Sequence, residues 1–409
     1  MKKNALLLPL AALAASVFAS AAHAQDEQVV LIGLAAPLTG ASARIGKDLE
    51  NGAQLAIDDA NAKHPTLGGK PVLYKLVSAD DQSDPRTAVT VAQQLVERHV
   101  VGVVGHWNTG CSVPAARIYH DAGIAQIAPA STGHQYTLQG FDTSFRIMGH
   151  DDDSGAYTGA YAVKTLKAQR IAVIDDQTAF GAGLANQFIK GVQANGGNVI
   201  DHQYVTDKTI DFSGVLTEIK GKRADLVFLG GIDVEAAPLV RRMRQLHIQA
   251  PLLGAGGFVS QTFLKLAGPA GEGVTALEPG RPLDRMPGGP AFDAQYRARW
   301  HAPIELHAPF AYDAAATLIA ATQQVNSADP KQIVAALHTI RRDGVTGTIA
   351  FDAQGNLKDP AYTIYQVRDG KWAVVDVLGG GTPAQAAGKP AAKAAAKTAA
   401  KTAAKTAAR

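Results

Sequence analysis

Short apolar runs alternate with helical segments over residues 28–129, and this alternation is the strongest pattern in the chain. QVVLIGLAAPL, VLYKLVSAD, VVGVVG and IAQIAP are apolar runs typical of strands. The segments between them, KDLENGAQLAIDDANA, PRTAVTVAQQLVER and VPAARIYHDAG, are predicted helices, and apolar residues recur with helical spacing in the first of them. Continuous apolar strands separated by helices predict a parallel sheet covered on both faces, and therefore an α/β domain.

The alternation starts again after GFDTSFRIMGHDDDSG and predicts a second α/β domain of similar build. Its predicted strands are RIAVIDD, NVIDHQYV, ADLVFLGG and PLLGAGG, and its predicted helices are AYTGAYAVKTL, GLANQFIKGVQANGG, FSGVLTEIKGK and EAAPLVRRMRQLHI. The two helices and few strands that follow residue 308 are too few for a third domain. We therefore expect them to complete the first two domains, with the chain crossing between them more than once.

The two ends of the chain differ from its body. Lys2 and Lys3 precede the apolar run ALLLPLAALAASVFAS, and AHA then places small residues at a cleavage site. This pattern predicts a secretory signal peptide over residues 1–24, with an uncleaved membrane anchor as the alternative. No later apolar run is long enough to span a bilayer, so we expect a soluble protein exported to the periplasm. Residues 379–409, rich in Lys and Ala and without acids, predict a disordered tail.

Charge and cysteine content exclude several kinds of function. The chain has 39 Lys and Arg against 36 Asp and Glu, but eight of the basic residues lie in the two terminal segments. The body therefore carries 31 basic against 36 acidic residues, which gives no support to nucleic-acid binding. The single cysteine, Cys111, excludes an intrachain disulfide and a Cys-rich zinc, haem or iron–sulfur site. We expect no metal and no cofactor.

Two successive predicted strands end in clusters of glycine and small hydroxyl-bearing residues. VVGVVG runs into HWNTGCS, and IAQIAP runs into ASTGH. Ligands of open α/β sheets bind outside the carboxyl ends of the strands, where these turns lie. With Pro114 at the first helical position and Ser112 as its cap, a helix start would offer N–H groups to an anion, and Thr109 and Thr132 would add hydroxyl donors. The turns therefore predict capture of a small anionic group such as a carboxylate, with ordinary turn and capping residues as the alternative.

No complete catalytic motif supports an enzyme. GCSVP (110–114) nearly matches G-x-S-x-G but ends in proline, and a lone cysteine beside a helix start is more often packed than reactive. FGAG (180–183) lacks the third glycine of a dinucleotide-binding motif, and neither a P-loop nor H-E-x-x-H occurs. Asp151–Asp153 are expected to form a solvated run that caps a helix, because no calcium-loop spacing follows. An exported hydrolase is kept as an alternative.

Several stretches give the chain a family resemblance, and they occur in family order. They are IGLAAPLTG with NGAQLAIDDANA, SADDQSDPRTAVTVAQQLV, GVVGHWNTGCSVPAARIYHDAGI, IAPASTGHQYTLQGF, RIAVIDDQTAFGAGLA, DLVFLGGID, APFAYDA and GVTGTIAFDAQGNLKDPAYTIYQV. From about residue 28 to 372 the chain resembles type I periplasmic binding proteins of the leucine/isoleucine/valine-binding kind, which serve ABC importers. The resemblance implies two Rossmann-like lobes with parallel sheets, joined by three crossovers. Lobe one is then expected over 26–149 plus 281–358, and lobe two over 150–280 plus 359–378.

The resemblance also implies which residues of lobe one hold a ligand. Backbone and hydroxyl groups of the two turns would bind an α-carboxylate, with Thr109 and Thr132 at the hydroxyl positions and Ala130 beside them. The pocket for the ligand's side chain would border Trp107 and the helix-entry turn near Ile45.

Lobe two departs from the family pattern at two positions. The family closes a tyrosine over the ligand where this chain has Phe180, and it meets the ammonium with an acid where this chain has Gly256. Asp233 is then the nearest substitute for that acid. The full set of expected ligand-binding residues is Trp107, Asn108, Thr109, Ala130, Ser131, Thr132, Phe180 and Asp233.

The expected function is that of the periplasmic solute-binding component of an ABC importer. It would bind a small carboxylate-bearing solute, foremost a branched-chain or other amino acid, by closure of two lobes. The expected partners are this small-molecule ligand and the membrane permease subunits, and we expect a monomer. Because Phe180 and Gly256 depart from the family pattern, an amide or an aromatic carboxylate is an alternative ligand. A sensory receptor domain of the same fold is an alternative function.

Overall fold

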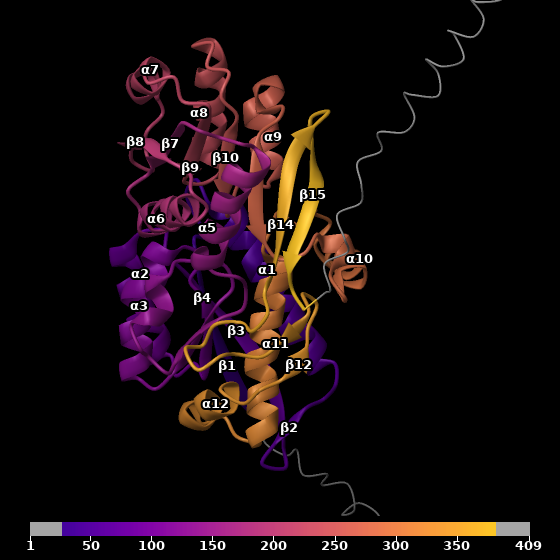
Figure 1. The fold of residues 1–409 in the computed structure, drawn as a ribbon. Helices are drawn as coiled ribbons and strands as arrows, with labels where there is room; N and C mark the ends of the chain where they lie inside the picture. The colour runs from indigo at the N-terminus through magenta and orange to yellow at the C-terminus, as the bar shows by residue number, and fades with distance from the viewer. Residues whose placement is uncertain (1–26, 382–409) are drawn as a thin grey trace, which may run out of the picture. The chain divides into compact units, whose positions relative to one another are not determined.

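A computed structural model describes residues 27–381, and its contacts divide the chain into two units (Figure 1). Unit one comprises the described residues up to Ile147 together with Met286–Asn356. Unit two comprises Met148–Arg285 and the chain from Leu357 onward. The chain therefore passes between the units three times, as the resemblance implies. The predicted signal peptide and, beyond residue 381, the predicted tail lie outside the described residues.

Unit one contains a sheet in the order β2-β3-β1-β4-β5-β6. Its strands run parallel except β2, which pairs antiparallel with β3. The bounds are β1 (Gln28–Ala36), β2 (Thr66–Leu67), β3 (Lys70–Asp80), β4 (Gly102–Gly105), β5 (Ala125–Ala128) and β6 (Ser144–Arg146). β6 was not predicted, because a strand of three residues inside a polar segment leaves no run of apolar positions.

Helices cover this sheet, and two of them approach each other closely. The helices are α1 (Ala43–Asn61), α2 (Pro85–Glu97), α3 (Thr109–Asp121), α4 (Gln135–Leu138), α10 (Gly289–Trp300), α11 (Ala308–Val325) and α12 (Pro330–Leu337). A separate two-stranded antiparallel sheet is formed by β12 (Arg342–Asp343) and β13 (Thr348–Ile349). α1 and α11 pack side by side (Figure 1). A Cβ atom on Gly52 of α1 would lie 2.2 Å from the carbonyl oxygen of Ala308, so only glycine allows this approach. α11 also covers β4, where a Cβ atom on Gly102 would meet Leu318 at 2.5 Å.

A buried carboxylate fastens the start of α11 to α1. The Asp48 oxygens accept hydrogen bonds from the N–H groups of residues 305–308 at 2.8–3.1 Å. The N–H groups of His307 and Ala308 belong to the start of α11, where a helix leaves them without intrahelical acceptors, so the carboxylate satisfies them together with the two N–H groups just before the helix. Burial raises the pKa of Asp48 above its ordinary value, although these hydrogen bonds act in the opposite direction.

The prediction for the start of α3 was wrong. The helix begins at Thr109 with Asn108 as its N-cap, and Pro114 lies inside it rather than at its first position. Ser112 cannot cap the helix from within, and its hydroxyl is bound elsewhere, to the carbonyl of His106 at 3.3 Å. The predicted anion-binding helix start therefore lies five residues earlier than Pro114, at the turn itself.

Unit two contains a sheet in the order β15-β14-β11-β10-β9-β7-β8. Strands β8, β7, β9, β10 and β11 are parallel, whereas β14 pairs antiparallel with both β11 and β15. The bounds are β7 (Ile171–Asp175), β8 (Val199–Tyr204), β9 (Leu226–Gly230), β10 (Leu252–Ala255), β11 (Thr275–Pro279), β14 (Ala361–Arg368) and β15 (Lys371–Gly379). Along β7, Ala172 and Ile174 pack into one core, while Ile171 and Val173 pack into a second core on the other face. A strand apolar on both faces has no polar alternation, which explains its continuous hydrophobic sequence.

The helices of unit two are α5 (Asp151–Ala160), which continues as a π-helical turn (Tyr161–Thr165), α6 (Ala179–Ala194), α7 (Ser213–Gly221), α8 (Asp233–Gln245) and α9 (Gln261–Ala267). Asp151–Asp153 form the first turn of α5, where acidic side chains favour the positive end of the helix dipole. The expectation that this run is solvated was wrong for Asp151, which is buried. Among the residues described in both units, no helix is long and apolar enough to cross a bilayer.

Candidate functional site

The two turns predicted from sequence meet at one edge of the unit-one sheet. β4 and β5 are parallel neighbours, so the segments that follow them leave the sheet on the same side. The Thr109 hydroxyl accepts a hydrogen bond from the N–H of Gly133 at 3.1 Å. The Ser131 hydroxyl donates to the carbonyls of His106 and Trp107, both at 3.1 Å. The turn after β4 and the turn after β5 are therefore joined by hydrogen bonds of the Thr109 and Ser131 hydroxyl groups.

Thr132 differs from its neighbours because its hydroxyl is buried and has no hydrogen-bond partner in the described part of the chain. Leaving such a group unsatisfied costs about 1–3 kcal/mol, so native structures rarely keep one without a reason. The Asn108 side-chain oxygen is also without a partner. Each turn thus carries one polar atom of a predicted ligand-binding residue whose hydrogen-bonding capacity no described residue uses.

The remaining lobe-one residues of the predicted site lie on the same two turns. Trp107, almost fully buried, precedes the start of α3, and Ala130, half-buried, precedes Ser131. α3 begins at Thr109, which is hydrogen-bonded to Gly133 next to Thr132. The turn that carries Thr132 therefore lies beside the positive end of the α3 dipole and beside N–H groups that have no intrahelical acceptor. This is the electrostatic environment in which a carboxylate binds.

A buried cation supports the second turn, and sequence reasoning missed it. The Arg146 guanidinium, fully buried at the end of β6, donates to the carbonyl of Thr132, to the carbonyl of Gly133 at 3.0 Å and to the Thr137 hydroxyl at 3.2 Å. It fixes the backbone that carries the Thr132 hydroxyl, and its positive charge favours an anion at this turn. No sequence motif marks Arg146, because its partners are mostly backbone carbonyls.

A second buried network supports the first turn. The His106 ring lies 2.7 Å from the Asp81 carboxylate through Nδ1 and 3.2 Å from the Tyr119 hydroxyl through Nε2. Burial raises the pKa of Tyr119 well above 10, so the phenol keeps its proton and can donate it to Nε2. The Nδ1 atom shares a hydrogen bond with the Asp81 carboxylate, so both ring nitrogens of His106 are held. These three residues anchor the backbone just before Trp107.

Asp81, His106 and Cys111 are also the one group of potential metal ligands that lie close together among the described residues. Both ring nitrogens of His106 already have partners, and burial strongly raises the pKa of the Cys111 thiol. To bind a metal ion, Cys111 would have to lose its proton and His106 would need a ring nitrogen without another partner. The chemistry of this cluster is therefore that of a packed hydrogen-bond network.

The predicted residues of unit two lie near one another within that unit. Phe180 is the second residue of α6 and packs, half-buried, on the core. Gly256 follows β10 with a positive φ of 66°, and a Cβ atom on it would come within 3.1 Å of the Phe180 ring. The two positions at which the sequence departs from the family pattern are therefore in contact, and an acid at position 256 would be strained.

Asp233 occupies a different environment from the one the sequence analysis expected. It is the first residue of α8, is buried, and accepts a hydrogen bond from the Ser260 hydroxyl. Ser260 in turn caps α9 by accepting from the N–H of Phe263 at 2.9 Å. This arrangement favours a structural role for Asp233 between two helix starts.

Two further buried carboxyl groups of unit two accept backbone hydrogen bonds, Glu278 from the turn after β10 and Glu235 from the residue before α8. Glu278 accepts hydrogen bonds from the N–H groups of Phe258 at 3.0 Å and Val259 at 3.3 Å, and burial raises its pKa to about 7. Glu235 accepts from the N–H of Ile232 at 2.7 Å, and burial raises its pKa to about 8. Both groups are therefore partly protonated in the native protein near neutral pH.

We expect stability to fall as pH rises from about 4.5 to 8 because of these two groups. In that window the native protein binds more protons than the unfolded chain, so each group lowers the unfolding free energy by at most about 1.4 kcal/mol per pH unit. Glu278→Gln should flatten the pH dependence of the urea midpoint between pH 4.5 and 7. Glu272→Gln is the matched control, since exposed Glu272 also accepts two backbone hydrogen bonds. Parallel pH profiles for Glu278→Gln and the unsubstituted protein would contradict the expectation.

Comparison with known proteins decides the family. A sequence model described as periplasmic binding protein matches residues 29–371. The chain belongs to the periplasmic binding protein family. An amino acid binding protein of Pseudomonas aeruginosa is 34% identical over 362 residues, which cover 88% of this chain and 95% of that protein. The resemblance expected from the sequence motifs is thereby confirmed.

Solved periplasmic binding proteins share the fold. A leucine binding protein, LivK, from Thermotoga maritima matches with a TM-score of 0.78 at 25% identity, covering 85% of this chain and 98% of that one. A solute-binding protein from R. palustris, solved in complex with benzoate, matches with a TM-score of 0.75 at 21% identity, covering 88% and 98%. These matches confirm the two-lobed α/β architecture. The family is one of solute-binding proteins, so the hydrolase alternative gains no support from it.

Proposed function

We propose that this periplasmic binding protein is the solute-binding component of an ABC importer and binds a small carboxylate, foremost an amino acid. The observation that carries the proposal is the buried, unpartnered hydroxyl of Thr132. It lies on a turn that Arg146 supports and that Thr109 joins to the start of α3. A carboxylate oxygen there would accept the Thr132 proton in a charge-assisted hydrogen bond.

The relatives support an amino acid as the solute. The Pseudomonas aeruginosa relative is named for amino acid binding, and the Thermotoga maritima structure for leucine binding. As part of the proposal, the protein works in the periplasm, binds its solute by closing the two units and delivers it to membrane permease subunits. Ligand that binds the closed form more tightly shifts the protein toward that form.

An aromatic carboxylate is the second candidate, and a specific contact favours it. Phe180 lies against Gly256. Position 180 therefore offers an apolar ring where the family has a tyrosine hydroxyl, and position 256 has no side chain where the family has an acid. Asp233, the substitute acid, already accepts a hydrogen bond from Ser260. Phe180 and Gly256 supply no partner for an ammonium group, so a carboxylate without an amine is compatible with this surface.

A thermal-shift screen tests the proposal and separates the two candidates. The probes are leucine, isoleucine and valine, their amides, 4-methylpentanoate as leucine without its amine, and benzoate with benzamide. A bound ligand at 100 times its Kd stabilises the native state by about 2.7 kcal/mol, so binders raise the melting temperature clearly. We expect carboxylates to stabilise and their amides to fail.

The pattern among carboxylates then identifies the solute class. Stabilisation by leucine but not by 4-methylpentanoate means that the amine is recognised, whereas stabilisation by benzoate and 4-methylpentanoate means that it is not. If amides stabilise the protein as well as the acids do, the carboxylate proposal fails. Closure would show as a smaller radius of gyration in X-ray scattering when the best ligand is saturating.

A further inference from the structure

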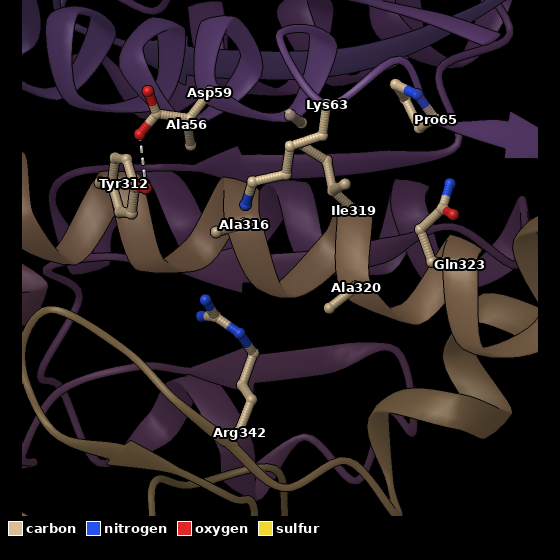
Figure 2. Close-up of a pocket in the computed structure, with 11 residues that line it drawn as sticks. Ala56, Asp59, Lys63, Pro65, Tyr312, Ala316, Ile319, Ala320, Gln323 and Arg342 are labelled. Carbon is tan, nitrogen blue, oxygen red and sulfur yellow. Dashed lines mark hydrogen bonds between the residues drawn. The ribbon is translucent and has the colours of Figure 1, made fainter.

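A cavity of about 380 Å³ lies in unit one on elements other than the two turns. Residues of α1, of the segment after α1, of α11 and of β12 line it (Figure 2). None of these residues belongs to the turns after β4 and β5, and none was singled out by the sequence analysis. The cavity is large enough for a small organic molecule.

The floor of the cavity is apolar and made of short side chains. Ala56 and Ala60 of α1 face it from one side, and Ala316, Ile319 and Ala320 of α11 from the other. Because four of these five residues are alanine, the two helices leave space that longer side chains would fill. Such a floor binds an apolar body by burying its surface.

Two cations reach over this floor from different elements. Figure 2 shows the Lys63 amino group and the Arg342 guanidinium group both directed toward Ala316. The Lys63 ammonium group forms no hydrogen bond or ion pair with any residue that the structure describes. Arg342 donates to the Thr317 hydroxyl at 3.2 Å through one nitrogen, which holds it in place and leaves other N–H groups for a ligand.

The acids near these cations are already bound. Asp59, which lines the cavity, accepts from the Tyr312 hydroxyl at 2.8 Å and from Gln295 at 2.6 Å. Asp313 lies 3.7 Å from Arg342 but accepts three hydrogen bonds from residues 345–346. Neighbouring donors thus hold both carboxylates in place, while Lys63 and part of the Arg342 guanidinium carry donors that no described residue uses.

We propose that this cavity is a second ligand site, which binds a small organic carboxylate. The carboxylate lies between Lys63 and Arg342, and its apolar body covers Ala316, Ile319 and Ala320. A bare inorganic anion would leave the apolar floor exposed to water, and a neutral molecule would gain no attraction from the charges of the exposed Lys63 ammonium and the Arg342 guanidinium. This site does not depend on the function proposed for the two turns.

The test follows the Ile319 methyl group by NMR while benzoate is added, with benzamide as the neutral comparison. Ile319 forms part of the floor, so its signal reports on this cavity alone, and Ile319→Val identifies the signal. We expect benzoate to shift it in a saturable way and benzamide to need at least about tenfold more ligand. Lys63→Gln should weaken benzoate binding about tenfold or more, and Ala320→Leu should abolish it by filling the floor.

Lys70→Gln is the matched control, because Lys70 is exposed in the same unit and does not line the cavity. Thr132→Val should leave the Ile319 shift unchanged, which separates this site from the two turns. No shift with benzoate, an equal shift with benzamide, or equal binding by Lys63→Gln and Lys70→Gln would each overturn the second site. None of these outcomes bears on the function proposed for Thr132.

Discussion

Replacing Thr132 by valine is expected to weaken binding of the carboxylate ligand by roughly 10- to 100-fold without lowering stability. A hydrogen bond to a charged group is worth about 1.5–3 kcal/mol, and about 1.4 kcal/mol is a factor of ten in affinity. Valine has nearly the same shape as threonine and removes a buried hydroxyl that has no partner in the ligand-free protein. Calorimetry with the best carboxylate from the thermal-shift screen measures the loss.

Thr143→Val is the matched control for this substitution. Thr143 is buried in the same unit and its hydroxyl also lacks a partner within the described chain, but it lies outside the two turns. We expect its affinity for the ligand to equal that of the unsubstituted protein. Thr109→Val should reduce both affinity and stability, since the Thr109 hydroxyl accepts the Gly133 hydrogen bond. If Thr132→Val binds the ligand normally, the carboxylate does not lie at this turn.

Replacing Arg146 by methionine is expected to lower the free energy of unfolding by about 3–5 kcal/mol. The Thr132 carbonyl loses its side-chain donor, while the Gly133 carbonyl and the Thr137 hydroxyl each lose one of two partners and keep Tyr136 and Asn356 respectively. An unsatisfied buried polar group costs about 1–3 kcal/mol, and the three costs are not fully additive because the groups share one partner. Urea unfolding measures this loss, and calorimetry should show weaker ligand binding because the Thr132 turn is no longer fixed.

Arg117→Met is the control for the loss of an arginine. Arg117 is exposed, pairs with Asp121 on the surface of α3 and lies over the Phe141 ring, so its removal should change stability by no more than about 1 kcal/mol. Arg146→Lys keeps the charge but not the fork of donors, and should recover part of the stability. Equal urea midpoints for Arg146→Met and Arg117→Met would contradict a supporting role for Arg146.

The fold could be predicted from the sequence wherever apolar periodicity is long. β1, β3, β7 and β9 stand out because parallel sheets covered on both faces give continuous apolar runs. β6, β11, α9 and α10 were missed. The first three are only three, five and seven residues long, and α10 carries an irregular mixture of charged and aromatic residues. The start of α3 was misplaced because Pro114 resembles a first helical residue, whereas the hydrogen bonds of Ser112 are visible only in three dimensions.

The candidate site was predictable only in part for a similar reason. Glycine and hydroxyl residues at two strand ends indicated the turns, and parallel pairing of β4 with β5 brings those turns together. The supporting roles of Arg146 and of the Asp81–His106 pair could not be inferred from the sequence. Arg146 binds a backbone carbonyl 13 residues away, and Asp81 and His106, which bind each other, are 25 residues apart. Phe180 and Gly256 are 76 residues apart, so their contact is likewise visible only in the folded protein.

The interleaved chain of unit one has a consequence for synthesis. α11, which follows almost the whole of unit two in sequence, covers β4 and is fastened to α1 by Asp48. A ribosome that has made residues 1–285 has therefore produced every strand of the six-stranded sheet but none of the helix that closes one side of it. Domains fold as units, so the nascent chain cannot complete its first domain until most of the polypeptide has emerged. Such late completion keeps the polypeptide open for translocation, which suits the export that its N-terminal sequence predicts.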